Sequence, residues 1–496
     1  MISKHQVVCT VCVCAILFVF DTACLSQPEA AGKIYRDVNN ISFRGNSVSW
    51  GMKITSSNFS DGAFLVETTG ARFEYASGIL KVYQGLSGTK RLLSTITFDQ
   101  NAPFERVVDN DDHVLLWSEK LNIGVYGDST CIIAPRTELI MSCKGNFKPD
   151  FENRYNGELL LIDSLGGMEI YPQRYEAGYE IINIELGKKD WLANYRLKAN
   201  ERVMLAAFPG KPFDWDASFK SNLIVMYGSM GYGKGNVYGQ MPPESIIAEW
   251  SKNFHIVYLS YQGLYENPTK KKYGYPGGPY TVANEAEFRR FVKTAHSYNL
   301  KVSPYTSLYY HQQINPDRED YFQQVKALKE QFDIDGVFVD GLLPDLEGYK
   351  MDDKCGRWEM IRRLRQLFGN GPIVYHTSNK DIPFDIVPNV DVYASITLTG
   401  ENVPFQSVND PYVKYAVRKY GISNTVGMWV LGKHPDTISP QLILDAEISM
   451  NCRKRWGSYI PIDKAPPDNK YKWGTKIDGG YSYYLKKLAI LKRQQY

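Results

Sequence analysis

The first half of the chain, from about residue 43 to residue 208, consists of short segments in which apolar and polar residues alternate. Ala71–Ala76 reads Ala-Arg-Phe-Glu-Tyr-Ala, and the turn pair Ser77-Gly78 follows. The next segment, Ile79–Tyr83, is predicted to be the returning strand of a hairpin. A period of two is typical of strands with one buried face. Strands at this spacing, separated by Gly, Asn and Asp, predict an antiparallel β-sandwich, which we assign to residues 36–212.

After Ser221 the pattern changes to strands alternating with amphipathic helices. Phe288, Phe291, Val292 and Ala295 share one helical face, for example. Eight strands are predicted, at Leu223–Tyr227, Ile256–Leu259, Val302–Tyr305, Val337–Val339, Ile373–Tyr375, Val390–Ala394, Gly427–Leu431 and Tyr459–Pro461. Eight such alternations match a (β/α)8 TIM barrel, which makes the chain an α/β protein with a preceding sandwich.

The barrel is assigned to residues 221–496. A doubly wound sheet is the alternative architecture, but the glycine-rich stretch Gly228–Gly235 after the first strand contains neither of the phosphate-binding glycine motifs. We therefore read this stretch as a loop above the first strand.

The amino-terminal residues have the pattern of an export signal. Lys4 and His5 precede an apolar run from Val7 to Phe20, which is too short to span a bilayer comfortably. Small residues precede Gln27, so residues 1–26 are predicted to be a signal peptide. The mature protein is then expected to be secreted, periplasmic or held at the cell surface, with no membrane span.

Composition narrows the choice of partner. The chain has 57 Lys and Arg against 54 Asp and Glu, a formal net charge of +3. Such mild basicity argues against a dedicated nucleic-acid binder, which concentrates basic side chains in stripes. It is compatible with an anionic polymer as substrate. The seven histidines form no H-x-H or H-E-x-x-H motif, so neither a metal nor another cofactor is expected.

Cysteine usage argues against a structural zinc site. Four of the eight cysteines lie within the predicted signal peptide, and the remaining four form no C-x-x-C pair. Cys131 and Cys143 are close enough in sequence to clip a hairpin by a disulfide in an oxidising compartment.

The strongest candidate for chemistry is Asp340. Val337–Val339 is a short apolar run with Asp335 before it and Asp340 after it. In a barrel of parallel strands the chemistry lies at the carboxyl ends, and residues at the amino ends serve stability. Asp340 is therefore the catalytic candidate, while Asp335 is expected to shape the turn that enters the strand. The structural alternative for Asp340 is a residue that only caps a loop or helix.

A second acid, Glu401, follows the predicted sixth strand. Two carboxyl groups on one rim are what glycoside hydrolysis needs, one as nucleophile or base and the other as acid. A retaining enzyme would hold the carboxyl groups of Asp340 and Glu401 about 5–5.5 Å apart. The structural alternative for Glu401 is a solvated loop residue. Rival acids occur on neighbouring loops, namely Glu266, Asp345, Glu347 and Asp352.

Aromatic and histidine side chains near the strand ends could bind sugar. Tyrosine rings present flat apolar faces with a polar group, and the chain has 35 of them. We select Tyr227, Tyr305, His311, His376 and Trp429 as candidate substrate-binding residues. Each has a structural alternative as a packed residue of the core.

With Phe-Val-Asp340-Gly ending the fourth strand and an acid after the sixth, the chain resembles the retaining glycoside hydrolases of clan D. That clan includes the α-galactosidases and α-glucosidases of families 27, 31 and 36. The resemblance implies a β-sandwich joined to a (β/α)8 barrel, with Asp340 as nucleophile and Glu401 as acid/base. The chain differs from that clan in having glutamate where an aspartate is typical.

The sequence thus predicts a secreted glycoside hydrolase that acts on an oligosaccharide or polysaccharide. The alternative function is a non-catalytic carbohydrate-binding protein on the same scaffold, whose acids only bind sugar hydroxyls.

Overall fold

The computed structural model describes residues 51–85, 90–101, 103–155, 158–163, 165–172, 180–199, 201–212, 223–226, 241–252, 254–259, 264–266, 277–315, 317–341, 354–376, 388–399, 426–428, 452–454 and 456–457. The predicted signal peptide and the predicted closing helix near Leu485 lie outside these residues.

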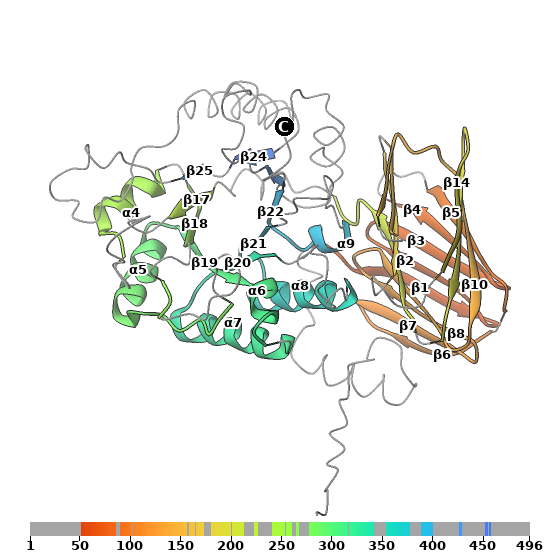
Figure 1. Cartoon of the computed structure of the whole chain (residues 1–496), viewed down its shortest axis with the longest axis horizontal. Helices are drawn as coiled ribbons and strands as arrows, with labels where there is room; N and C mark the ends of the chain where they lie inside the picture. Colours follow the sequence, from red (N-terminus) through yellow and green to blue (C-terminus); the bar gives the residue numbers. More distant parts are fainter. Residues whose placement is uncertain are drawn as a thin grey trace, which may run out of the picture. The chain divides into compact units, whose positions relative to one another are not determined.

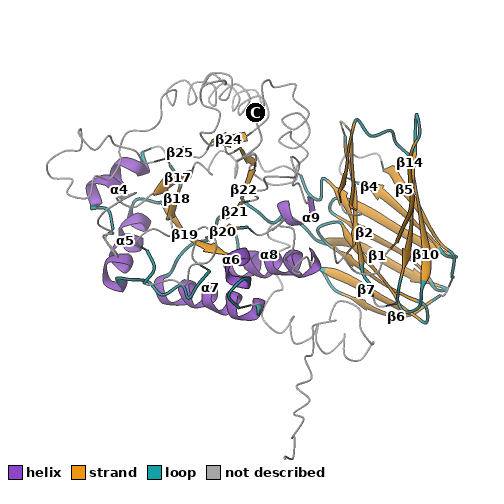
Figure 2. Cartoon of the chain, in the orientation of Figure 1, coloured by secondary structure: helices purple, strands orange, loops and turns teal. Residues whose placement is uncertain are grey.

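Two antiparallel sheets of eight strands each form the first half (Figures 1 and 2). The first sheet has the order β1 (Ile54–Ser60), β2 (Ala63–Thr68), β3 (Ala71–Ala76), β4 (Ile79–Gln84), β5 (Arg91–Phe98), β10 (Leu139–Gly145), β15 (Trp191–Leu197), β14 (Glu180–Leu186). The second sheet has the order β11 (Phe151–Tyr155), β12 (Glu158–Asp163), β13 (Gly166–Pro172), β16 (Val203–Phe208), β9 (Thr130–Pro135), β8 (Leu121–Tyr126), β7 (His113–Ser118), β6 (Phe104–Asp109). The sheets share one apolar core, as a sandwich requires.

The two sheets differ in how they are buried. Strands of the first sheet such as β3 and β15 alternate between buried and more exposed residues. In the second sheet, by contrast, every residue of β7, β8, β9 and β16 is buried. These four strands are therefore covered on the face that points away from the sandwich core as well.

The hairpin disulfide suggested by spacing is wrong. Cys131 lies on β9 in the second sheet and Cys143 on β10 in the first sheet, and both are buried free thiols of the shared core. Burial away from charge raises the pKa of each thiol, because the thiolate would lose its hydration. Their part in the fold is apolar packing.

The second half contains one parallel sheet (Figure 2). Its order is β24 (Cys452–Lys454), β23 (Val426–Met428), β22 (Ile396–Thr399), β21 (Ile373–His376), β20 (Val337–Asp340), β19 (Lys301–Ser307), β18 (Ile256–Leu259), β17 (Leu223–Met226), β25 (Trp456–Gly457). The helices described between these strands are α4 (Glu244–Ser251), α5 (Glu285–Ser297), α6 (Leu308–Gln312), α7 (Arg318–Phe332), α8 (Lys354–Phe368) and α9 (Pro388–Asp391).

The two outermost strands of this sheet, β24 and β25, are nearly consecutive in the chain. A single residue separates them. One pairs with β23 and the other with β17, so the same short stretch of chain borders both ends of the parallel order.

The first five predicted strands match β17 to β21 within a few residues. The predicted sixth strand, Val390–Ala394, is wrong. Its first residues belong to the short helix α9, and the strand that pairs with β21 is β22, at Ile396–Thr399. Tyr459–Pro461, the predicted eighth strand, lies outside the described residues, and β24 and β25 are the strands found just before it.

A buried polar cluster joins the second antiparallel sheet to α8 and the segment after α9. We call it the Asp128 cluster. The carboxylate of Asp128 accepts hydrogen bonds from Trp358 Nε1 at 2.7 Å and from the Tyr393 hydroxyl at 2.8 Å. Arg362 forms an ion pair with Asp112 and stacks its guanidinium 4.5 Å from the Trp358 ring. Burial raises the pKa of Asp128, although the Arg362 charge and the donors oppose that rise.

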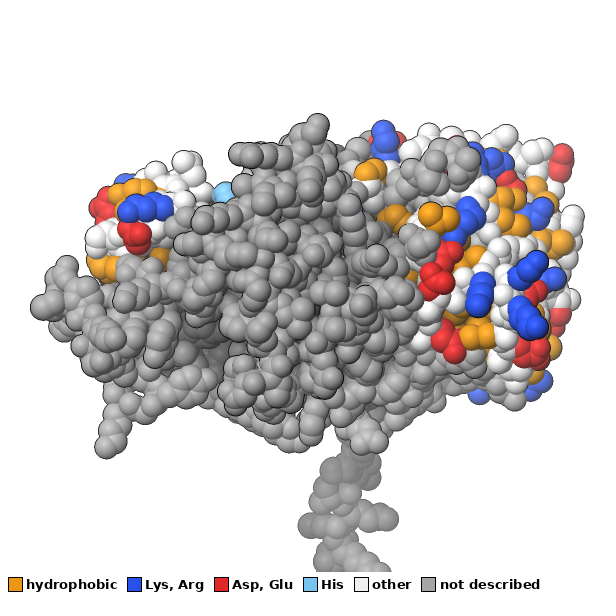
Figure 3. Space-filling view, turned by 90° about the horizontal axis from the view of Figure 1, so that it is seen from above, with side chains coloured by type: hydrophobic (Ala, Val, Ile, Leu, Met, Phe, Trp, Pro, Cys, Tyr) orange, Lys and Arg blue, Asp and Glu red, His pale blue; other side chains and the backbone are white. Residues whose placement is uncertain are grey.

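In a view from above, basic and acidic side chains are interspersed over the described part of the visible surface (Figure 3). This agrees with the nearly balanced charge of the sequence. Among the described residues there is no helix that is both long and apolar enough to cross a membrane.

Candidate active site

Asp340 is the last residue of β20 and is buried, with 9% of its surface exposed. In the parallel register it lies between Ser307 of β19 and His376 of β21. The next residue, Gly341, has φ +62°, and a Cβ there would lie 2.6 Å from the Cβ of Tyr309. The Asp-Gly pair is thus explained by the sharp left-handed turn that ends the strand.

Tyr305 binds the Asp340 carboxylate. Its hydroxyl donates a hydrogen bond to Oδ2 of Asp340 at 2.8 Å, and its ring stacks against Phe338 at a centroid distance of 5.9 Å. Burial, followed by the neighbouring Asp340 charge, raises the pKa of Tyr305 well above its usual value. The phenol therefore stays protonated and acts as a hydrogen-bond donor to the carboxylate.

Ser307 binds the main chain of the same residue. Its Oγ donates to the Asp340 carbonyl at 2.8 Å and accepts from the backbone N–H of Tyr310 at 3.1 Å. The second contact is an N-cap, since Ser307 immediately precedes α6. Because Ser307 and Tyr305 are two residues apart on one strand, their side chains lie on the same face of the sheet. Asp340 is thus bound at both its carboxylate and its carbonyl.

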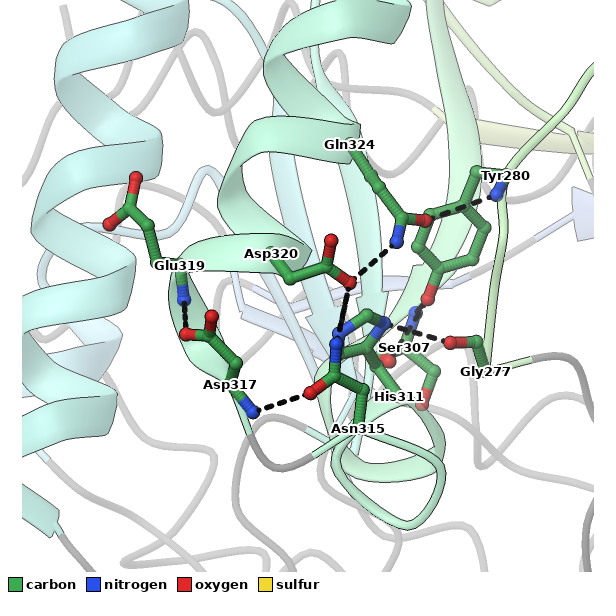
Figure 4. A network of polar contacts seen from close by, with 9 residues as sticks. All are labelled: Gly277, Tyr280, Ser307, His311, Asn315, Asp317, Glu319, Asp320 and Gln324. Atoms are coloured by element: carbon green, nitrogen blue, oxygen red, sulfur yellow. Dashed lines mark hydrogen bonds and ion pairs between the residues drawn. The ribbon is translucent and has the colours of Figure 1, made fainter. Parts of the chain in front are cut away.

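His311 is packed inside the protein, with 2% of its surface exposed. Its Nδ1 lies 2.9 Å from the carbonyl oxygen of Gly277, which places the proton of the neutral ring on Nδ1. Its Nε2 lies 3.3 Å from Oδ2 of Asp320, within ion-pair distance but outside hydrogen-bond geometry (Figure 4). Burial lowers the pKa of His311, against the opposing effects of Gly277 and Asp320. The ring therefore links α6 to the segment that contains Gly277.

Of the other acids, Asp335 lies at the amino end of β20. Its Oδ2 accepts from the backbone N–H of Val302 at 2.9 Å and lies 2.7 Å from His296 Nε2. These contacts tie α5 and β19 to the turn before β20, in agreement with the shaping role expected for Asp335. Glu266 is exposed. The rivals Asp345, Glu347 and Asp352 lie outside the described residues.

The roles of four predicted site residues, Tyr227, His376, Glu401 and Trp429, remain predictions. Tyr227, Glu401 and Trp429 lie outside the described residues. The separation of the Asp340 and Glu401 carboxyl groups is therefore also still a prediction. The backbone of His376 pairs in register with Asp340, which puts it beside the candidate nucleophile along the sheet edge. With β22 ending at Thr399, Glu401 follows its strand by two residues rather than by seven.

Sequence reasoning missed three residues of this region: Tyr265, Tyr280 and Ser307. Tyr280 exchanges hydrogen bonds with both backbone groups of Ser307, at 2.9 and 3.0 Å, and the hydroxyl of Tyr265 donates to the carbonyl of Tyr305. For Ser307 a signal existed, because it lies two residues after Tyr305 on the same strand. Tyr265 also had a signal, as an aromatic residue soon after the second predicted strand of the barrel. Tyr280 had none, since it comes from a separate segment of the chain.

Within the described residues, no group of three or more His, Cys, Asp or Glu side chains is arranged to hold a metal ion.

The chain matches no family model and no curated protein. Solved structures give distant likenesses. A GH36 alpha-galactosidase from Geobacillus stearothermophilus has a TM-score of 0.43 at 9% identity, over 87% of this chain and 86% of that one. An alpha-galactosidase from Lactobacillus brevis has a TM-score of 0.40 at 9% identity, over 87% and 83%. A GH31 dextranase from Flavobacterium johnsoniae has a TM-score of 0.37 at 8% identity, over 89% and 68%. Evidence for a function therefore has to come from the residues around Asp340.

Proposed function

We propose that this protein is a glycoside hydrolase that works with retention of configuration, with Asp340 as the nucleophile. The observation that carries the proposal is the environment of Asp340. It is a buried carboxylate at the carboxyl end of a parallel strand, oriented by the Tyr305 phenol at 2.8 Å. A carboxylate in this position can attack an anomeric carbon to form a glycosyl-enzyme.

Glu401 is the proposed acid/base. It follows β22, two strands from β20 in the parallel order. In a retaining enzyme this residue first protonates the leaving oxygen and then removes a proton from the water that hydrolyses the glycosyl-enzyme.

We further propose that the parallel sheet closes into a (β/α)8 barrel. The support is the position of β24 and β25, which are nearly consecutive in the chain yet border opposite ends of the order. If β24 and β25 act as one eighth strand, the sheet has no open edge. The domain boundaries at 36–212 and 221–496, the signal peptide at 1–26 and export from the cytoplasm belong to this proposal.

The substrate is proposed to be an oligosaccharide or polysaccharide, with an anionic polymer compatible with the balanced charge. Tyr227, His376 and Trp429 are proposed to contact it from the strand ends. For Tyr305 and His311 the contacts described above favour other roles, since both side chains are bound to protein groups and buried. We propose that they position the site instead of contacting sugar.

The test begins with a panel of polysaccharides and oligosaccharides and detection of released reducing sugar. On any substrate found, Asp340→Asn should lower turnover by several orders of magnitude, because the amide has nearly the same volume but no negative charge. The matched control is Asp333→Asn. Asp333 is an exposed acid at the other end of β20, with φ +57°, a conformation that asparagine tolerates.

Near-normal turnover in Asp340→Asn would contradict the nucleophile assignment. If no glycoside is cleaved, yet sugar binds and Asp340→Asn weakens the binding, the protein is instead the non-catalytic carbohydrate-binding protein that the sequence left as its alternative.

A further inference from the structure

Strand β19 extends beyond the described part of its pairing with β18. The pairing of β18 with β19 ends at Leu259 and Pro304, whereas β19 continues to Ser307. On its other side β19 stays paired with β20 as far as Ser307 and Asp340. The backbone groups that face the β18 side of this extension are buried and need other partners, because an unpaired peptide group in the interior is costly.

Two tyrosine hydroxyls supply those partners. Tyr265 donates to the carbonyl of Tyr305. The hydroxyl of Tyr280 accepts from the Ser307 N–H at 2.9 Å and donates to the Ser307 carbonyl at 3.0 Å. Their rings contact each other at a centroid distance of 5.2 Å. The two phenols thus bond backbone groups of Tyr305 and Ser307, within the last three residues of β19.

The residues stabilised in this way are the two that bind Asp340. Tyr305 holds the carboxylate and Ser307 holds the carbonyl, each at 2.8 Å. Tyr280 is therefore connected to the candidate nucleophile through a single intervening residue, Ser307. A shift of the Ser307 backbone would move the Asp340 main chain directly.

Tyr280 is itself firmly attached to α6 and α7 (Figure 4). Its backbone N–H donates to Gln324 Oε1 at 3.2 Å, and His311 binds the carbonyl of Gly277 three residues earlier. A Cβ on Gly277 would lie 2.2 Å from the Tyr310 carbonyl oxygen, so only glycine allows this approach. The segment from Gly277 to Tyr280 is thus fixed to the helices that follow β19.

We propose that Tyr280 is a positioning residue for Asp340, acting through Ser307, whose backbone N–H and carbonyl both bond the Tyr280 hydroxyl. The inference rests on the proposed function to the extent that Asp340 is the group positioned for attack. It adds a residue from the segment after β18 to a site otherwise built from β19 and β20.

The experiment compares Tyr280→Phe with Tyr321→Phe. Tyr321 is an equally buried tyrosine whose hydroxyl bonds Thr306, the residue before Ser307, at 2.8 Å on the helix-facing side of β19. Both variants lose one buried phenolic hydroxyl, and a general loss of stability should be similar in the two. Two quantities are measured: kcat and KM on a glycoside found in the panel, and the rate of carbodiimide coupling at Asp340 relative to the exposed Asp333, followed by peptide mass spectrometry.

Tyr280→Phe is expected to lower kcat about tenfold, because a small displacement of a reacting group is costly, while KM changes little. The relative labelling rate of Asp340 should change in Tyr280→Phe and stay at the wild-type value in Tyr321→Phe. Equal behaviour of the two variants in both measurements would overturn the inference. A change in Asp340 labelling in a protein that cleaves no glycoside would support the positioning role and count against the proposed function alone.

If Tyr280→Phe does not fold, Gln324→Ala provides the second variant. It removes the acceptor for the Tyr280 N–H from a half-buried helix position where alanine is favourable. A smaller change in the same direction in both measurements is expected. Wild-type kcat and wild-type Asp340 labelling in this variant would contradict the inference.

Discussion

At the scale of single residues, the main finding is the buried environment of Tyr305. Its position near a strand end predicted an aromatic side chain that stacks on a sugar. In the structure its ring is buried against Phe338, and its hydroxyl donates a hydrogen bond to Asp340. The side chain of a tyrosine near the end of a strand can contact either a ligand or a residue of the neighbouring strand. The local sequence does not distinguish these possibilities, because the side chain that binds Tyr305 comes from 35 residues further along the chain.

Tyr305→Phe is expected to reduce turnover about tenfold or more while the protein stays folded. The ring and its stacking remain, but the carboxylate loses an oriented donor in a buried site, at a stability cost of about 1–3 kcal/mol. Steady-state kinetics and urea unfolding measure the two effects. Tyr321→Phe serves as the control, since its hydroxyl bonds Thr306 instead of the candidate nucleophile. Unchanged turnover in Tyr305→Phe would show that this hydrogen bond does not orient Asp340.

At the scale of elements, the sixth strand shows where the hydrophobic pattern failed. Val390–Ala394 is buried and, apart from Asp391, apolar, and both a buried strand and a packed helix have this pattern. The sequence did contain two distinguishing signals. Pro388 is the first residue of α9, a position that proline favours, and Ile396-Thr-Leu-Thr is rich in β-branched residues. In the sequence, Glu401 then follows the end of its strand by two residues.

The turn after β20 makes its own prediction. Gly341→Ala should destabilise the protein more than Gly369→Ala, although both glycines have positive φ, at +62° and +57°. A Cβ at Gly369 meets nothing within 4 Å, so this variant loses only about 1 kcal/mol from the backbone conformation. A Cβ at Gly341 would also collide with Tyr309 and add about 1–3 kcal/mol. Chemical denaturation of both variants measures the difference, and equal losses would contradict the contact with Tyr309.

At the scale of the whole molecule, four strands of the second antiparallel sheet, β7, β8, β9 and β16, are buried on both faces, and the Asp128 cluster joins this sheet to α8. Every partner of Asp128 in that cluster is more than 200 residues away in the sequence, at Trp358 and Tyr393. A buried carboxylate that accepts these hydrogen bonds makes the two halves of the chain depend on each other for stability.

Asp128→Asn should remove the part of the pH dependence of the unfolding free energy that comes from the titration of Asp128. Burial raises the pKa of Asp128 above its usual value of 3.8, so the folded state binds the proton more tightly than the unfolded chain does. The contribution of this group to stability is complete below about pH 3.8 and is lost as pH rises through the higher folded pKa. Unfolding free energies measured from pH 4 to pH 8 should therefore fall less steeply in Asp128→Asn than in the wild type. Parallel curves would show that Asp128 titrates normally.

The sequence by itself determined the element types of most of the described chain. Burial of one face makes apolar residues recur every two positions in a strand and about every 3.6 positions in a helix. The first half of the chain shows only the strand pattern, whereas the second half alternates strands with amphipathic helices. This difference predicted an antiparallel half followed by a parallel half. The different burial of β3 and β7 was not predicted from the sequence and came from the structure. Asp340 was found from the sequence pattern, as an acid that ends a buried strand.

Tertiary structure alone decided which residues surround that acid. Ser307 and Tyr305 reach Asp340 through the register between β19 and β20, and Tyr280 reaches Ser307 from a different segment. Tertiary structure likewise separated Cys131 and Cys143 into facing sheets despite their nearness in sequence. The physical reason is common to these cases. Local pattern reports how a residue is buried, whereas a hydrogen-bond partner is chosen by the packing of elements distant in the chain.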